Sequence, residues 1–314
     1  RLTGRFPGGG LGLAVARRIL DARLVEAARG AGAEIREGCV VEELLYEQGA
    51  VAGAVVRDRG GEAKVLRSRI VIGADGLRSL VARRIGRRRY GAPSRLALVA
   101  HVGEVTGLDG HAEMHLGVQG YVGLNRIGDG VANVALVLPR KLARGASGRV
   151  PSFFFEQLER FPGVAGRVRP DLVVREIMVT GPFAAWSGRI VTDGALLVGD
   201  AADFFDPFTG EGIYSALKGA ELAAGVLDPV LRATSGVIPG WRLQPYRAAR
   251  RAAFTGKWLV ERLVGYGMLA PRLFSRAVRK LDEHGLGDTF VGVTADLLPA
   301  RAVLNPAFLS RMVL

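Results

Sequence analysis

The sequence predicts an α/β fold in which an open, mainly parallel sheet is interrupted by an inserted antiparallel sheet domain and followed by helices. Two short apolar strands, one ending at Gly73 and one at Val198, each lead into a glycine–aspartate pair and then a helix, as strands of open parallel sheets do. Between about residues 95 and 185, strand-like runs alternate with glycine turns, which is typical of an antiparallel sheet. From residue 241 to residue 298 the apolar positions have helical spacing.

The composition is that of an ordinary globular protein and bounds the possible partners. The chain has 314 residues, with 49% hydrophobic and 23% charged, which fits one large domain or two intimate ones. Its net charge is +13, but Arg is spread along the chain apart from the run at residues 83–89, and aromatic residues do not alternate with that run. We therefore expect a solvated basic face and no nucleic-acid partner. Cys39 is the only cysteine, which excludes an intrachain disulfide.

Residues 1–94 are expected to form the first part of the α/β domain. Apolar positions at helical spacing predict a helix over residues 12–31, ended by Gly32. Residues 69–72 are an unbroken apolar strand, as in a buried parallel sheet, and the next helix begins near Ser79. The other strands predicted in this part lie at residues 33–36, 40–46, 51–56 and 64–66.

Three further parts follow. Residues 95–185 are expected to form the inserted sheet domain, and residues 186–240 return to the α/β domain with a strand over 195–198. Residues 241–314 form a C-terminal helical region. Within the inserted domain, strands are predicted at residues 96–102, 112–116, 121–124, 131–138 and 173–179, and a helix at 151–161.

The two strand ends carry the residues that suit ligand chemistry. Asp75–Gly76 follows the first apolar strand, and Gly199–Asp200 follows the second. Open α/β sheets bind ligands at the carboxyl ends of their strands, where Asp accepts hydrogen bonds from sugar hydroxyls and the next helix start attracts negative oxygens. Either Asp alone could simply cap a helix. The two together, in this order, favour a nucleotide-like ligand.

Three segments resemble the motifs of one enzyme superfamily. GADGLRSLV at residues 73–81 and GDAADFFDPFTGEGI at residues 199–213 are similar to the DG and GD motifs of flavin-dependent oxidoreductases with the para-hydroxybenzoate hydroxylase fold. RRILDARL at residues 17–24 resembles the RxxxDxxL helix of that family, and Val41 matches the strand whose backbone meets the adenine. The resemblance implies FAD as cofactor and an FAD-binding Rossmann-like domain.

The resemblance also implies individual roles. Asp200 would hold the ribitol of FAD, Pro207 would face the isoalloxazine ring, and Asp75 would support the diphosphate side. The backbone from Gly210 to Ile213, at a helix start, would stabilise negative charge on the reduced ring. Arg17 would contact the cofactor. The cofactor-binding residues assigned in this way are Arg17, Val41, Asp75, Gly76, Gly199, Asp200, Pro207, Gly210, Glu211, Gly212 and Ile213.

The first motif of the family has no counterpart in the sequence. Members open with a strand, the fingerprint GxGxxG, a helix and an acidic residue about 20 residues later. The nearest segment, GLGLAV at residues 10–15, lacks the third small residue and a preceding strand, and the chain starts at Arg1. We therefore expect the first βαβ unit to be missing. The alternative is that the chain is not an enzyme but a truncated, non-catalytic remnant that binds no FAD.

The resemblance leaves two reactions open. Residues 206–217 look most like the geranylgeranyl reductase branch, yet its YxWxFP motif is replaced by GYVGLN at residues 120–125, and the halogenase motif WxWxIP is absent. One reading is a monooxygenase-like hydroxylation of a lipophilic or aromatic small molecule. The other is reduction of prenyl double bonds. In both reactions the flavin does the chemistry, and no side chain is assigned as catalytic. NAD(P)H is one candidate electron donor, and the donor stays open.

Other candidate sites are weaker. His111 to His115 lacks the Glu that directly follows the first His in helical zinc motifs, so we expect no metal. Glu211 is either a carboxylate at a helix start or a catalytic group. The apolar stretch 258–274 is either a core or lid helix or a peripheral membrane contact. No signal peptide or spanning helix is predicted, so we expect a cytoplasmic protein; the oligomeric state stays open.

Overall fold

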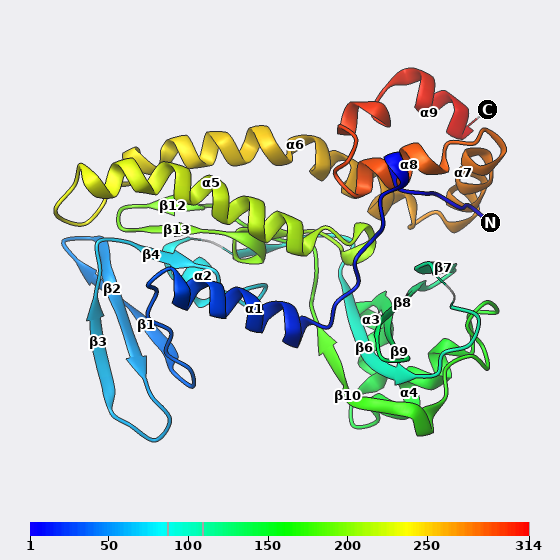
Figure 1. The fold of residues 1–314 in the computed structure, drawn as a ribbon, viewed down its shortest axis with the longest axis horizontal. Coiled ribbons are helices and arrows are strands. Elements are labelled where there is room, and N and C mark those ends of the chain that lie inside the picture. Colours follow the sequence, from blue (N-terminus) through cyan, green and yellow to red (C-terminus); the bar gives the residue numbers. More distant parts are fainter. Residues whose placement is uncertain (87, 109, 314) are drawn as a thin grey trace.

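The fold predicted from the sequence is confirmed: an α/β part, an inserted antiparallel sheet and C-terminal helices (Figure 1). The computed structural model describes residues 1–86, 88–108 and 110–313. Arg87, a member of the basic run, lies outside the described residues.

Two parallel strands from distant parts of the sequence form the centre of the α/β part. β4 (Val71–Gly73) pairs in parallel with β13 (Ala195–Leu197), and β12 (Val191–Thr192) pairs antiparallel on the other side of β13. Each strand of the parallel pair is followed by a helix, α2 (Leu80–Ile85) after β4 and α5 (Gly212–Arg232) after β13. Because the register joins Leu197 to Gly73, the carboxyl ends of both strands lie at one edge.

The N-terminal part differs from the expectation in two places. The first helix, α1 (Arg17–Gly30), begins five residues later than predicted, because the backbone stays extended at Ala16. The strand predicted at residues 33–36 is wrong: within the described chain those residues pair with no strand, and an isolated extended segment has no ladder to stabilise it. A three-stranded antiparallel sheet follows, formed by β1 (Val40–Glu47), β2 (Ala50–Arg57) and β3 (Ala63–Arg67).

The inserted sheet has five antiparallel strands in the order β10-β6-β9-β8-β7. One face packs on α3 and α4 through a core that includes Leu98, Val122 and Phe154. Alternate residues, among them Ala97 and Tyr121, face the other way and pack with aromatic side chains near the second strand end. The elements are β6 (Arg95–Gly103), β7 (Glu113–Gly117), β8 (Gly120–Gly128), β9 (Val131–Pro139), α3 (Arg140–Ala143), α4 (Val150–Leu158) and β10 (Val173–Thr180).

A small sheet that the sequence did not predict ties the parts together. β11 (Ala185–Ser187) lies between β14 (Asp203–Phe204) and β5 (Arg88–Tyr90), antiparallel to both. Strands of two or three residues are too short to show a periodic pattern. This sheet links the segment after the second strand end to the chain that enters the inserted domain.

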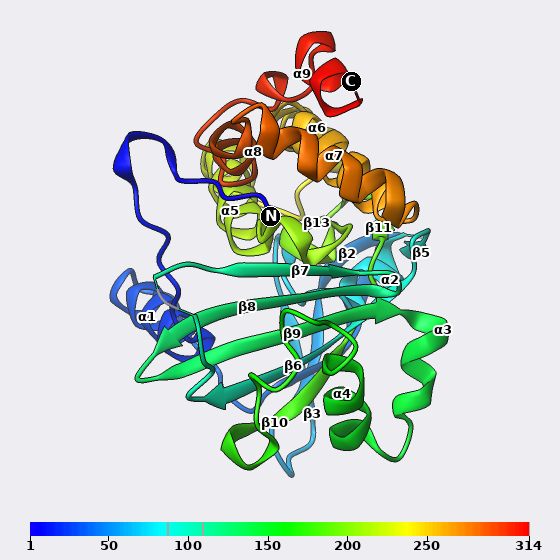
Figure 2. The ribbon, with the colours of Figure 1, turned by 90° about the vertical axis from the view of Figure 1, so that its right-hand side faces the viewer.

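The C-terminal helices lie above the edge of the inserted sheet, with α7 over β7 (Figure 2). Residues 1–12 run along this region before the chain reaches α1, and the Arg5 amide donates to Asp288 Oδ1 at 2.7 Å (Figure 1). None of the described helices is both long and apolar enough to span a bilayer. The elements are α6 (Gln244–Gly267), α7 (Pro271–Glu283), α8 (Gly287–Thr294) and α9 (Pro306–Val313).

Candidate cofactor and substrate site

The ends of the two parallel strands form a glycine-rich edge. The Val198 amide donates to the Gly73 carbonyl at 2.9 Å, and Gly199 has φ +55°, with α5 so near that an added Cβ would lie 3.3 Å from Ala216. Gly76 and Gly210 also have positive φ, but a Cβ added at either would meet no atom within 4 Å. Backbone with open space above it is suited to a ligand that lies against the chain.

Asp75 caps the helix that follows its strand. Its Oδ2 accepts the amides of Leu80 at 2.6 Å and Val81 at 3.2 Å, and Ser79 Oγ accepts the amide of Ala82 at 2.8 Å. The capping alternative considered for this aspartate therefore describes its contacts within the chain. Its role toward a diphosphate stays a prediction.

The Asp200 side chain is half-buried at the second strand end, and no described residue donates a hydrogen bond to its carboxylate. Burial raises the pKa of its carboxyl, against the attraction of Arg88 and Arg17. The structure thus brings Arg17 of α1 near Asp200, although the two are 183 positions apart in the printed sequence. A half-buried carboxylate that lacks donors suits ligand hydroxyls.

Arg88 joins the two strand-end loops, and the sequence did not single it out. Its guanidinium donates to the carbonyls of Leu77 at 3.0 Å, Asp200 at 2.8 Å, Ala201 at 2.8 Å and Ala202 at 3.4 Å. Burial lowers the pKa of Arg88. The planar fork of Arg reaches several carbonyls at once, so this side chain fixes the spacing between the DG and GD loops.

A buried carboxylate anchors the loop that carries Pro207. Asp206 accepts Arg95 Nη1 at 2.7 Å, the Tyr121 hydroxyl at 2.5 Å and the Phe208 amide at 3.1 Å. Arg95 is 4% and Asp206 is 5% exposed, and burial raises the pKa of Tyr121 well above its usual range. Arg95 and Tyr121 come from the inserted sheet, so this network fixes the Pro207 loop against that sheet.

A second ion pair lies under the same segment. Arg250 of α6 is 3% exposed and pairs with Asp203. Its guanidinium also lies over the rings of Phe254 and Trp258, at 4.9 and 5.9 Å from the ring centroids. Burial lowers the pKa of Arg250 to about 10. The pair holds α6 against the segment that leads to Pro207.

Glu211 is turned away from solvent at the start of α5. It is 7% exposed, and its Oε2 lies 3.5 Å from Nζ of Lys257 in α6. Burial raises the pKa of Glu211 to about 7, against the attraction of Lys257. Its side chain makes no capping bond to α5. The side chain of Glu211 therefore faces α6, while the backbone of Gly212 and Ile213 begins the helix.

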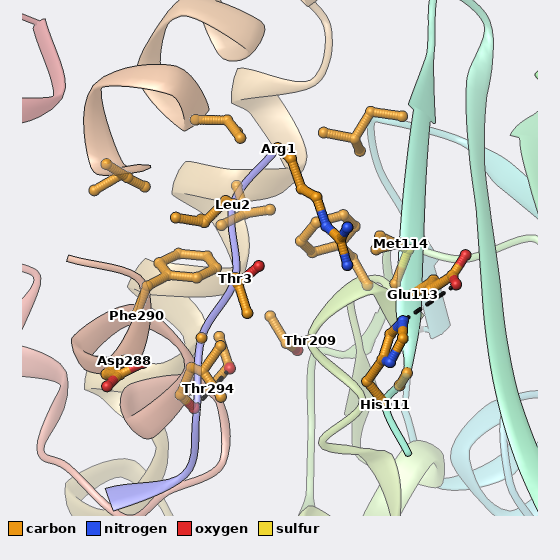
Figure 3. Close-up of a pocket in the computed structure, with 18 of the residues that line it drawn as sticks. Arg1, Leu2, Thr3, His111, Glu113, Met114, Thr209, Asp288, Phe290 and Thr294 are labelled. Carbon is orange, nitrogen blue, oxygen red and sulfur yellow. Dashed lines mark hydrogen bonds and ion pairs between the residues drawn. The ribbon is translucent and has the colours of Figure 1, made fainter. Parts of the chain in front are cut away.

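A large apolar cavity adjoins the Pro207 loop (Figure 3). Its volume is about 2060 Å³, and it lies between β7, the Phe208–Thr209 segment and the C-terminal helices, with residues 1–12 along one wall. The lining is mainly apolar and aromatic, which suits a lipophilic molecule. Apolar and aromatic residues that line it include Phe161, Phe208, Val260, Leu263, Phe274 and Phe290.

The histidine stretch at the mouth of this cavity is held by ion pairs. Glu113 accepts Arg167 Nη1 at 2.7 Å and lies 2.6 Å from Nε2 of His115 and 3.3 Å from Nε2 of His111. The Arg167 guanidinium, with His115, lowers the pKa of Glu113 to about 2. No group of three or more His, Cys, Asp or Glu able to hold a metal occurs within residues 1–86, 88–108 and 110–313.

Two residues assigned to the cofactor remain to be placed, Val41 and Ile213. Val41 lies on β1, in the sheet of β1–β3 rather than beside β4 and β13. Ile213 is 43% exposed on α5. The structure thus gathers the residues assigned to the second strand end and places Val41 in another sheet.

The residues present fit a flavin. Open space lies above Gly76 and Gly210, the Asp200 carboxylate lacks donors within the described chain, and Thr209 Oγ1 is buried with no partner there. A long ligand with a diphosphate, a polyol and a flat ring would use these groups. Fold and site together define a flavin-binding α/β protein.

Comparison with known proteins supports this class. Residues 13–121 match the family profile described as an FAD binding domain. Digeranylgeranylglycerophospholipid reductase 2 of Methanothermobacter thermautotrophicus is 33% identical over 242 residues, which cover 75% of this chain and 59% of that protein. The chain spans about three fifths of the length of the curated relatives it matches.

Solved structures show the same fold. The myxobacterial chondrochloren halogenase CndH is similar with a TM-score of 0.73 and 20% identity, over 95% of this chain and 72% of that one. A geranylgeranyl bacteriochlorophyll reductase-like protein from Thermoplasma acidophilum is similar with a TM-score of 0.66 and 23% identity, over 92% and 70%. Residues 13–121 are therefore an FAD-binding domain, the chain shares the fold of flavin-dependent enzymes, and FAD is its cofactor.

Proposed function

We propose that the chain is an FAD-dependent oxidoreductase that reduces carbon–carbon double bonds of a lipophilic, prenyl-type substrate in the cavity beside Phe208. The apolar cavity next to the Pro207 loop carries this proposal, because a molecule of that chemistry fits it. Similarity to digeranylgeranylglycerophospholipid reductases supports the choice of a prenyl substrate. The bound flavin would supply hydride transfer, and NAD(P)H would be the electron donor.

The side chains would position and shield the reacting groups. Asp200 would accept hydrogen bonds from the ribitol, and the amides from Gly210 to Ile213 would offset negative charge at the ring. Asp206, held by Arg95 and Tyr121, would fix the Pro207 loop between cofactor and substrate. The apolar lining would exclude water from the ring.

Hydroxylation of a lipophilic or aromatic molecule is the second candidate. The aromatic lining of the cavity, with Phe161, Phe208 and Phe274, favours it. Mass analysis of the product separates the two reactions. Reduction adds two hydrogens and proceeds without oxygen, whereas hydroxylation adds one oxygen atom and consumes oxygen.

The cofactor assignment is tested with Asp200→Ala. Loss of hydrogen bonds to a charged acceptor costs about 1.5–3 kcal/mol, so we expect FAD affinity to fall by roughly 10- to 150-fold in fluorescence titration. Asp228→Ala is the matched control, because Asp228 is an exposed carboxylate on α5 paired with Arg232. Equal FAD affinity of the Asp200 variant and the control would remove Asp200 from the site.

A further inference from the structure

Glu211 is buried in a cluster of ionisable side chains that come from α5, α6 and the segment after α8. It stands at the start of α5, faced by Lys257 and Glu261 of α6, Asp296 after α8, and Tyr214 on its own helix. Glu211 and Lys257 are each 7% exposed. Asp206 and Arg262 also act on Glu261.

Around Lys257, the cluster has more carboxylates than positively charged groups. Lys257 Nζ lies 3.5 Å from Glu211 and 3.3 Å from Asp296, and 4.0 Å from the ring centroid of Tyr214. Neither Glu211 Oε2 nor Lys257 Nζ has a hydrogen-bond partner of good geometry among the described residues. One ammonium therefore serves several carboxylates, and a buried group of this kind is most stable with a proton on one of them.

Burial raises the pKa of Glu211 to about 7 and that of Glu261 to about 8. Lys257 opposes both shifts. Neighbouring carboxyls add to these shifts, since Asp296 raises the pKa of Glu211 and Glu211 raises the pKa of Glu261. Burial and the neighbouring carboxyls thus favour a proton on this cluster up to a higher pH than on an ordinary glutamate.

We propose that Glu211 binds a proton when the flavin is reduced, so that its carboxyl offsets the charge that reduction places at the start of α5. The inference rests on the proposed flavin site, in which the amides from Gly210 to Ile213 meet the ring. Those amides adjoin Glu211 in the chain, and a negative charge that close favours the neutral carboxyl. Glu211 adjusts the charge beside the flavin ring by taking up a proton, and it does not contact the substrate.

The proposed proton uptake needs only electrons from a reductant and protons from solvent. Reduction adds two electrons and one proton to the ring, with dithionite as reductant in the test. One further proton passes from solvent to the carboxylate of Glu211, which becomes a carboxylic acid. No other bond forms or breaks, and reoxidation releases the same proton.

The test is the pH dependence of the reduction potential of the FAD-loaded chain above pH 7. With one proton per two electrons, the equilibrium constant changes tenfold per pH unit, about 30 mV; with two protons it changes 100-fold, about 59 mV. We expect the steeper slope in the wild type and in Glu221→Gln, an exposed control on α5. Glu211→Gln should show the shallow slope.

Two outcomes would overturn the proposal. One is the shallow slope in the wild type, a result that needs no variant to fold. The other is a steep slope that survives in Glu211→Gln; its loss in Glu261→Gln would then assign the proton to Glu261.

A second readout needs no cofactor. In the FAD-free chain, infrared titration should show a carboxyl that changes protonation near pH 7 and is absent in Glu211→Gln. Lys257→Met should move that titration to higher pH, because the attraction of Lys257 is lost. No such carboxyl would refute the proton-holding role, whereas a chain that titrates as expected but binds no flavin would refute the proposed function instead.

Discussion

Removal of the buried guanidinium of Arg95 should destabilise the protein far more than removal of an exposed one. In Arg95→Met the Asp206 carboxylate keeps only the Tyr121 hydroxyl and the Phe208 amide as donors, and the Gly265 carbonyl loses its bond from Arg95 Nη2 at 3.1 Å. Breaking one side of a buried ion pair costs about 3–5 kcal/mol, because the other charge stays buried.

The assay is equilibrium unfolding in urea, followed by circular dichroism, with the free energy of unfolding taken from the midpoint and slope. Arg232→Met is the matched control: it breaks the exposed pair of Arg232 with Asp228, worth about 0–1 kcal/mol. A double-mutant cycle with Asp206→Asn should give a coupling energy of about 1.5 kcal/mol or more between Arg95 and Asp206. A cost below about 1 kcal/mol for Arg95→Met, at an unchanged slope, would refute the reasoning.

Three further predictions follow from the same contacts. Burial raises the pKa of Glu261 to about 8, so the folded state keeps a proton that the unfolded chain releases above about pH 4.5. The free energy of unfolding should therefore fall as pH rises from about 4.5 towards about 8. Glu261→Gln should flatten that dependence in urea titrations across this range. Arg88→Lys keeps the charge but loses the fork that bonds four carbonyls, so it should cost about 1–3 kcal/mol in the same assay. An unchanged midpoint would contradict the bridging role. Gly199→Ala should lower the free energy of unfolding by about 1–3 kcal/mol, because Gly199 has a positive φ and Ala216 lies close to it. The loss should exceed that of Gly210→Ala, where the space is open. Equal thermal stabilities of the two variants would argue against the close approach of Ala216.

Much of the α/β architecture could be predicted because its signals are local. The apolar strands around residues 71 and 195 and their glycine–aspartate ends are visible in a few residues each. The helix after Ser79 is marked by its cap, since Ser79 Oγ accepts the Ala82 amide. Such patterns need no knowledge of distant contacts.

The rest depends on contacts between distant residues. Arg88 was read as one of several arginines in a basic run, because the carbonyls it meets lie up to 114 residues away. The pair of Arg95 and Asp206 is separated by 111 residues, and nothing near either residue marks it. The strand predicted at residues 33–36 shows the reverse case, in which a suitable local pattern has no partner in the described structure.

The sign of a carboxyl's pKa shift was equally hidden from the sequence. Glu113 begins β7 and Glu211 directly precedes α5, yet the pKa of Glu113 falls to about 2 and that of Glu211 rises to about 7. Arg167 donates to Glu113 through two nitrogens, whereas Glu211 is buried with a single ammonium at 3.5 Å. Burial and partner geometry decide the direction, and both are properties of the fold.

The visible absorption spectrum of the purified chain, after incubation with FAD and removal of the unbound excess, tests the central claim most directly. The account predicts flavin bands that remain with the protein and weaken in Asp200→Ala but not in Asp228→Ala. A colourless protein, with correct folding verified by circular dichroism, would contradict the claim that these strand ends hold FAD.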